Sequence, residues 1–174
     1  PAALDGMSSR TVTFVAPSKT FNIAGMKASV AIIPDESLRA RYISVIERFH
    51  LNSVNILGLT AMETAYAECG EWLDQLMSYL EINRNYTEEF IRERMPKAKI
   101  DHPEGTYIFW IDFRGYGFNS ETLQTFLVNK AKVAFNKDSN FGTAGDGFAR
   151  INIGTTHAQL AAALEQVAEA LEKI

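Results

Sequence analysis

The sequence predicts an α/β protein, because short runs rich in β-branched and aromatic residues alternate with segments of helical periodicity. Two apolar runs near the N-terminus are followed by prolines, as strands often are. A long stripe of apolar residues at helical spacing comes next, and strand-like and helix-like segments then alternate again. We therefore expect sheets that are covered by helices.

The first two predicted strands are residues 11–15 and 28–33, which are followed by Pro17 and Pro34. Both are mostly apolar, which is typical of strands that are covered on two faces. A helix is expected directly afterwards, with Asp35 near its N-terminus. Its apolar face consists of Leu38, Tyr42, Val45, Ile46 and Phe49.

The clearest predicted helix begins at Thr60, which can form a capping box with Glu63. Apolar side chains keep helical spacing past Gly70, where the helix can bend or break. They are Met62, Ala65, Tyr66, Cys69, Trp72, Leu73, Leu76, Met77 and Leu80. The pattern continues towards Pro96, and a helix this long suggests a connector between two packed units.

The second half of the chain is predicted to contain three strands and two helices. An aromatic strand at TYIFWIDF (106–113) precedes a helix at 120–131. Short strands at 133–135 and at RINIG (150–154) are expected on either side of a glycine-rich loop. The last helix is expected to be capped near Thr156, and its apolar side is formed by Leu160, Leu164, Val167 and Leu171.

Composition excludes several classes of function. Of the 174 residues, 47% are hydrophobic and 22% are charged, which is typical of a globular protein with a real core. A formal net charge of −4 disfavours nucleic-acid and membrane partners, because proteins that bind them usually carry a basic surface. The single cysteine, Cys69, excludes an internal disulfide and a cysteine-based zinc site, and it fits the reducing cytoplasm.

Lys19 is the first candidate for chemistry, because it follows a predicted strand within the segment APSKTFNIAG (16–25). A lysine amine becomes a useful nucleophile or base when burial or a nearby cation lowers its pKa. A small-residue turn after a buried strand offers that burial. The alternative is an exposed loop lysine, and the spacing alone favours it because lysines are usually exposed.

A second candidate lies in the segment FGTAGDGFARINIG (141–154), which is neither a phosphate loop nor a dinucleotide fingerprint. Its glycines are interpreted as a connection that permits positive φ. Arg150 enters an apolar strand, where a guanidinium can bind a carboxylate through two hydrogen bonds. A structural salt bridge is the alternative. No metal site is expected, because His50, His102 and His157 lack ligand spacing.

Three segments together resemble a known family: APSKTFNIAG, GTYIFWIDF and GDGFARINIG, in this order and at these distances. They are similar to the C-terminal half of class I/II aminotransferase-like enzymes, which are fold-type I enzymes dependent on pyridoxal 5′-phosphate (PLP). The motif SKTFNIAG is especially similar to that of the cystathionine β-lyase branch of the MalY/PatB type. The segment EWLDQLMSYLEINRNY (71–86) also resembles the long interdomain helix of that branch.

The resemblance implies roles for four residues. Lys19 would form the Schiff base with PLP and then act as the base that removes the substrate's Cα proton. Arg150 would bind the α-carboxylate of the substrate. Ser18 and Lys27 would contact the PLP phosphate, whereas Ala16 stands where relatives often have a serine.

The resemblance also implies an architecture. Residues 1–82 would be the end of the large PLP-binding domain with its connecting helix, and residues 83–174 the small C-terminal α/β domain. Other cofactor-binding groups of the family lie upstream of the lysine, so we expect a C-terminal portion of a larger polypeptide that is inactive alone. The complete protein is expected to be a homodimer.

The implied activity is a PLP-dependent C–S β-lyase that converts a sulfur amino acid such as cystathionine into a thiol, pyruvate and ammonia. An aminotransferase is the first alternative, because the candidate residues serve both reactions. A non-catalytic α/β module with the same fold is the second alternative.

Overall fold

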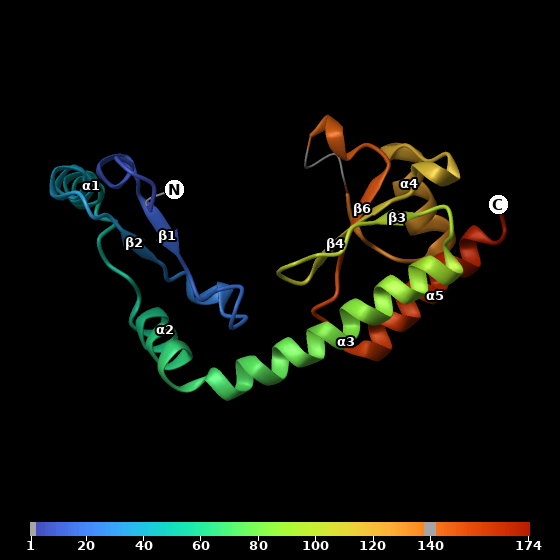
Figure 1. Ribbon diagram of the computed structural model, residues 1–174, viewed down its shortest axis with the longest axis horizontal. Coiled ribbons are helices and arrows are strands. Elements are labelled where there is room, and N and C mark those ends of the chain that lie inside the picture. The colour runs from blue at the N-terminus through green and yellow to red at the C-terminus, as the bar shows by residue number, and fades with distance from the viewer. Residues whose placement is uncertain (1–2, 138–141) are drawn as a thin grey trace. The chain divides into compact units, whose positions relative to one another are not determined.

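The computed structural model describes residues 3–137 and 142–174. It contains two compact units, Pro1–Gln75 and Leu76–Ile174 (Figure 1). Strands and helices alternate in both, so the predicted α/β class is confirmed. The predicted domain boundary after residue 82 stays a prediction.

The first unit is built on a two-stranded antiparallel sheet. Strand β1 pairs with β2, so that Phe14 lies opposite Ala31. Helix α1 follows as predicted, because the side chain of its N-cap Asp35 accepts a hydrogen bond from the backbone N–H of Leu38 at 2.7 Å. The elements of this unit are η1 (Ser8–Arg10), β1 (Thr13–Val15), η2 (Ala24–Met26), β2 (Val30–Ile32), α1 (Glu36–Arg48) and α2 (Ile56–Glu68).

The long helical segment is interrupted at the position that the sequence indicates. Helix α2 ends at the C-cap residue Cys69, and helix α3 (Gly70–Arg94) begins directly after it. The start of α2 differs from the prediction, because Asn55 rather than Thr60 is its N-cap. The Asn55 side chain accepts a hydrogen bond from the backbone N–H of Gly58 at 2.7 Å, so the helix begins before the predicted capping box.

The second unit contains a four-stranded antiparallel sheet in the order β3–β4–β6–β5. Its strands are β3 (Lys99–Ile100), β4 (Ile108–Asp112), β5 (Asn136–Lys137) and β6 (Phe148–Asn152). The strand predicted at 133–135 is wrong in position, since the pairing with β6 begins at Asn136. The other elements of this unit are η3 (Arg114–Tyr116), α4 (Ser120–Phe126), the π-helical turn η4 (Leu127–Ala131), η6 (Thr143–Gly145) and α5 (His157–Leu171).

Helices cover one face of this sheet and form a single hydrophobic core with it. Helix α5 runs beside the C-terminal part of α3 (Figure 1), and Arg94 on α3 bonds Glu165 and Glu172 on α5 at 2.8 and 3.0 Å. Thr156 caps α5 as predicted. All four predicted apolar residues of α5 are buried, together with alternate residues of β4 and β6, namely Phe109, Ile111, Ala149 and Ile151.

The first unit lacks a comparable core. Among the described residues before Leu76, the buried hydrophobic ones are Ala28, Ile33 and Ala65. The expectation that the first two strands are covered on both faces is therefore wrong for this chain: Phe14 is 60% exposed and Ile32 48%. The physical reason is that β1 and β2 pair only with each other in the described sheet, and two strands cannot enclose their own side chains.

Within residues 3–137 and 142–174, every helix is too short or too polar to span a membrane.

Candidate functional site

Lys19 lies in a turn between β1 and η2, on the first unit. The turn is closed by backbone hydrogen bonds from Phe21 N–H to the carbonyl of Pro17 (2.9 Å) and from Ile23 N–H to the carbonyl of Ser18 (3.1 Å). Pro17 is buried, whereas Lys19 is exposed. The amine is therefore exposed, which is the alternative that the spacing alone favours, and the neighbouring strand is exposed as well.

An aromatic cluster holds the C-terminal side of this turn against two helices. The Phe21 ring stacks on Trp72 with 6.3 Å between ring centroids, and it meets the edge of Tyr66 at 5.6 Å. Such aromatic contacts each stabilise by roughly 0.5–1.5 kcal/mol beyond the burial of their surface. Trp72 is nevertheless 45% exposed.

Asn55 fastens the other end of the segment. Its Nδ2 donates to the backbone carbonyl of Met26 at 2.9 Å, while its Oδ1 accepts from Gly58 N–H. The close approach needs glycine at 58, because a Cβ there would lie 2.7 Å from the Met26 carbonyl oxygen. The segment that carries Lys19 is thus tied to the first turn of α2.

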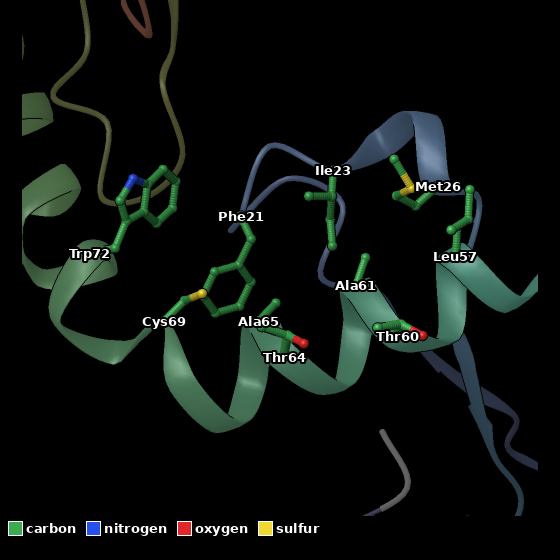
Figure 2. A pocket seen from close by; sticks show the side chains of 10 residues that line it. All are labelled: Phe21, Ile23, Met26, Leu57, Thr60, Ala61, Thr64, Ala65, Cys69 and Trp72. Carbon is green, nitrogen blue, oxygen red and sulfur yellow. The ribbon is translucent and has the colours of Figure 1, made fainter.

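A cavity of about 490 Å³ lies between this segment and α2. Figure 2 shows Phe21, Ile23 and Met26 facing the helix, with Ala61 and Ala65 on the opposite wall. The wall is almost entirely apolar, and Lys19 does not line it. The cavity therefore lacks the polar groups that a phosphorylated cofactor needs, and it is not the candidate reactive site.

Ser18 and Lys27 are close to Lys19 in the sequence and belong to the same unit. Ser18 is half-buried next to Lys19, and Lys27 is exposed directly after η2, in the left-handed region with φ 51°. A lysine amine can form a covalent bond with the carbon of an aldehyde, and a hydroxyl and an ammonium can donate hydrogen bonds to a phosphate. PLP has both an aldehyde and a phosphate, so the chemistry of these three side chains fits this cofactor.

Arg150 lies on β6 of the second unit, on the face of the sheet opposite the core. Its neighbours Ala149 and Ile151 point into the core, so Arg150 points the other way. Its Nε and Nη2 donate to Oδ1 of Asn136 on β5, at 3.3 and 3.1 Å. This partner is a neutral amide.

Other side chains on this outer face fix one another. Asp112 accepts hydrogen bonds from Nε and Nη2 of Arg114 at 2.9 and 2.7 Å. The Arg114 guanidinium lowers the pKa of the Asp112 carboxyl, and this carboxylate in turn raises the pKa of Arg114. Arg114 also lies over the Phe148 ring at 4.8 Å, and Phe148 meets Trp110 edge to face at 6.4 Å.

The end of β6 is held by a buried amide from α3. Asn83 is fully buried, and its Nδ2 donates to the backbone carbonyls of Ile153 and Thr155 at 2.9 and 3.0 Å. Its Oδ1 faces Nδ1 of His157 at 3.1 Å. Since both amide hydrogens serve carbonyls, Oδ1 must accept, so Nδ1 of a neutral His157 carries the proton.

The sequence did not indicate three asparagines whose side chains hold the segments around the candidate residues: Asn55, Asn83 and Asn136. Asn55 carries a local signal, because an asparagine followed by an apolar helical run is typical of an N-cap. Asn83 and Asn136 bond residues that are distant in the sequence, so no local pattern indicates them. The structure keeps Ser18, Lys19 and Lys27 in the first unit and Arg150 in the second. No cluster of three metal-ligating side chains occurs among residues 3–137 and 142–174.

Comparison with known proteins shows related chains, although no family model matches. The chain is 40% identical over 167 residues to cystathionine β-lyase PatB of Bacillus subtilis, and 34% identical over 144 residues to protein MalY of Escherichia coli. These matches cover 96% and 82% of this chain, but 43% and 37% of the relatives. The chain therefore spans less than half the length of these relatives.

Solved structures of PLP-containing proteins are also similar to this chain. A PLP-bound putative aminotransferase from Clostridium difficile superimposes with a TM-score of 0.92 at 37% identity. Cystalysin from Treponema denticola, which contains PLP, gives a TM-score of 0.92 at 35% identity. The two matches cover 97% and 98% of this chain and 43% of each of those chains.

By these comparisons, the class that the chain resembles is the fold-type I, PLP-dependent enzymes, of which it matches the C-terminal part. Within that class it is related to the cystathionine β-lyases of the PatB and MalY branch, as the lysine motif predicts. A curated aminotransferase matches at a lower identity, 26% for aspartate aminotransferase of Pyrococcus horikoshii.

Proposed function

We propose that the complete protein is a PLP-dependent C–S β-lyase that acts on a sulfur amino acid such as cystathionine. The observation that supports this most is the identity of 40% to a cystathionine β-lyase across 96% of the chain. The products would be a thiol, pyruvate and ammonia. When bound, PLP supplies an electron sink that stabilises negative charge on the Cα of the substrate.

Lys19 is proposed to hold the cofactor and to move protons. Its position in a turn that is fastened on both sides keeps the amine on a short, defined segment. Once the amino group of the substrate has displaced it from the cofactor, the Lys19 amine would accept the Cα proton. Ser18 and Lys27 are proposed to bind the phosphate, the first as a hydrogen-bond donor and the second as a cation.

Arg150 is proposed to bind the substrate's α-carboxylate. A guanidinium matches a carboxylate in shape and can bind it through two parallel hydrogen bonds. Fixing the carboxylate fixes the rotation about Cα, and therefore which Cα bond breaks. Residues 1–82 and 83–174 are proposed to be the end of the large PLP-binding domain and the small C-terminal domain. A homodimer and a cytoplasmic location belong to the same proposal and rest on the family alone.

The test uses the full-length PLP-loaded protein and L-cystathionine, without an added keto acid. Release of a thiol, measured with a disulfide reagent, together with pyruvate, measured by coupled NADH oxidation, supports the lyase. Turnover that requires a keto acid would instead support an aminotransferase. The identity of 37% to a putative aminotransferase is the reason for testing this alternative. Lys19→Ala should abolish both the turnover and the visible absorbance of lysine-bound PLP. A Lys19→Ala protein that keeps both would remove Lys19 from the site.

A further inference from the structure

A cavity of about 380 Å³ lies between the C-terminal ends of η4 and α5, which pack against each other in the second unit. Its lining includes three lysines, Lys130, Lys132 and Lys173, and one acidic residue, Glu169. In the part of the chain that the structure describes, none of these lysines forms an ion pair with a carboxylate. Their ammonium groups are therefore available to a ligand in this cavity.

The backbone of Lys132 is held in a conformation that lysine seldom adopts. Its φ is 58°, in the left-handed region that glycine and asparagine adopt more readily. The N–H groups of Lys132 and Val133 both donate to the carbonyl of Leu127, the second at 3.0 Å. Ala131 and Val133 are buried on either side, whereas Lys132 is exposed. The base of this charged side chain is therefore fixed beside the cavity.

Lysines near the C-terminal ends of helices also have a structural role, because they interact favourably with the helix dipole. That role accounts for Lys130 and Lys173, but it does not require a lysine at position 132, where glycine would fit the backbone better. The segment η4 is moreover a π-helical turn, a rare geometry that occurs frequently at functional sites. The combination of unusual backbone and convergent charge favours a ligand site.

The charge of the lining side chains matches that of a phosphate. Three lysines and one glutamate give an excess of two positive charges. A phosphate monoester carries about −1.5 to −2 at pH 7 and has three strong acceptor oxygens. Lysine suits this ligand, because its ammonium is a compact charge with three donors on a flexible stem.

The rest of the lining suits an organic group attached to the phosphate. Ala131 and Ala170 add buried apolar surface, Ile174 adds an exposed apolar side chain, and Gln166 adds an amide. The volume lies within the range of about 300–1,000 Å³ that is typical of small-molecule sites. We propose that this cavity binds an organic phosphate, with the phosphate held by the three lysines. None of its residues belongs to the proposed PLP and substrate sites, so this inference is independent of the proposed function.

The experiment uses the full-length PLP-loaded protein, in which PLP occupies the phosphate site proposed for Ser18 and Lys27. The probes are ADP, which has phosphates and an organic body, and inorganic pyrophosphate, which has the phosphates alone. The Kd of each probe is measured by isothermal titration calorimetry, and the thermal midpoint of each variant by calorimetric unfolding. The variants are Lys132→Gly, Lys173→Gln and the control Lys97→Gln. Lys97 is an exposed lysine of the same unit that lies over the Tyr116 ring and does not line the cavity.

ADP is expected to bind more tightly than pyrophosphate, because only ADP can contact the apolar part of the lining. Lys132→Gly and Lys173→Gln should each raise the Kd of ADP about tenfold, the change that follows when a hydrogen bond to a charged group is lost. Lys97→Gln removes the same charge elsewhere and should leave the Kd within about twofold. Lys132→Gly should not lower the thermal midpoint, since glycine adopts the left-handed conformation without strain. Weaker binding without a loss of stability would separate a ligand-binding role from a structural one.

Several outcomes would contradict the proposal. Absence of ADP binding at millimolar concentration would overturn the site. An unchanged Kd in Lys132→Gly and Lys173→Gln would remove the two lysines from it. An equal loss of affinity in Lys97→Gln would also overturn the site, because it would indicate a general attraction between charges. Pyrophosphate that binds as tightly as ADP would overturn the assignment of an organic ligand.

Discussion

Asn55 joins the first turn of α2 to the segment that carries Lys19: its Nδ2 donates to the carbonyl of Met26 at 2.9 Å, and its Oδ1 caps the helix at Gly58. One side chain thus performs two tasks through its two different ends. The amide is the only neutral side chain of this length with a donor and an acceptor, so asparagine suits the position and aspartate does not.

Two substitutions at Asn55 should separate these tasks. Asn55→Ala loses both the cap and the tether and should lower the free energy of unfolding by about 1 kcal/mol or more. Asn55→Asp keeps an acceptor for the helix but has no donor for Met26, so it should preserve the helix and loosen the lysine segment. Chemical denaturation measures the first effect, and PLP affinity in the full-length protein measures the second. Equal PLP affinity in Asn55→Asp and the unmodified protein would show that the tether is unimportant.

Gly58 offers a steric test of the same contact. In Gly58→Ala, the new Cβ would lie 2.7 Å from the carbonyl oxygen of Met26, so the segment or the helix must shift. A loss of about 1–3 kcal/mol in the free energy of unfolding is expected from this overpacking. Gly70→Ala is the control, because a Cβ at Gly70 meets no atom within 4 Å and alanine favours the helix. Equal stability of the two variants would contradict the close approach.

The buried Asn83 should be among the most sensitive positions of the second unit. Asn83→Ala leaves the carbonyls of Ile153 and Thr155 without these two donors, and each unsatisfied buried group costs about 1–3 kcal/mol. Asn85→Ala, at an exposed position on the same helix, should be nearly neutral. Thermal unfolding of the two variants measures the difference.

The tautomer of His157 is a separate prediction from the same contact. Because Oδ1 of Asn83 accepts at 3.1 Å, the neutral ring should carry its proton on Nδ1. Nitrogen-15 chemical shifts of the imidazole at a pH where the ring is neutral would report this directly. A ring protonated on Nε2 in the folded protein would show that the amide has the opposite orientation.

Asp112 should make stability depend on pH in the acid range. Its pKa is lowered from the ordinary value of 3.8, chiefly by the hydrogen bond from the Arg114 side chain. The folded protein therefore binds this proton less readily than the unfolded chain, so the contribution is complete above the ordinary pKa. It is lost as the pH falls from about 4 through the lowered pKa. Denaturant unfolding from pH 6 downwards should show a smaller acid loss in Asp112→Asn than in Asp101→Asn, an exposed control. Identical acid profiles would contradict the ion pair.

The sequence predicted the second unit better than the first, and the reason is physical. Helix α5 has its cap at Thr156 and buries Leu160 and Leu164 as expected, because cap and stripe are local patterns that the unit's own core satisfies. The sequence near Lys19 predicted two strands that are covered on both faces, but they are exposed. Whether a strand is covered depends on which other elements pack against it, and a local sequence pattern does not give that information. Likewise, the sequence indicated Arg150 but not its partner Asn136, since strand register decides that contact.

The distribution of the core has a consequence for local motion. The hydrophobic cluster consists of residues between Phe90 and Leu171, so amide hydrogens of β4, β6 and α5 should exchange with solvent only through large-scale unfolding. The turn at Lys19 has few buried apolar neighbours of its own, and its amides should exchange through small openings in this chain. Arg150, the proposed carboxylate-binding residue, therefore lies in a slowly exchanging strand, and Lys19, the proposed cofactor-binding residue, lies in a rapidly exchanging turn.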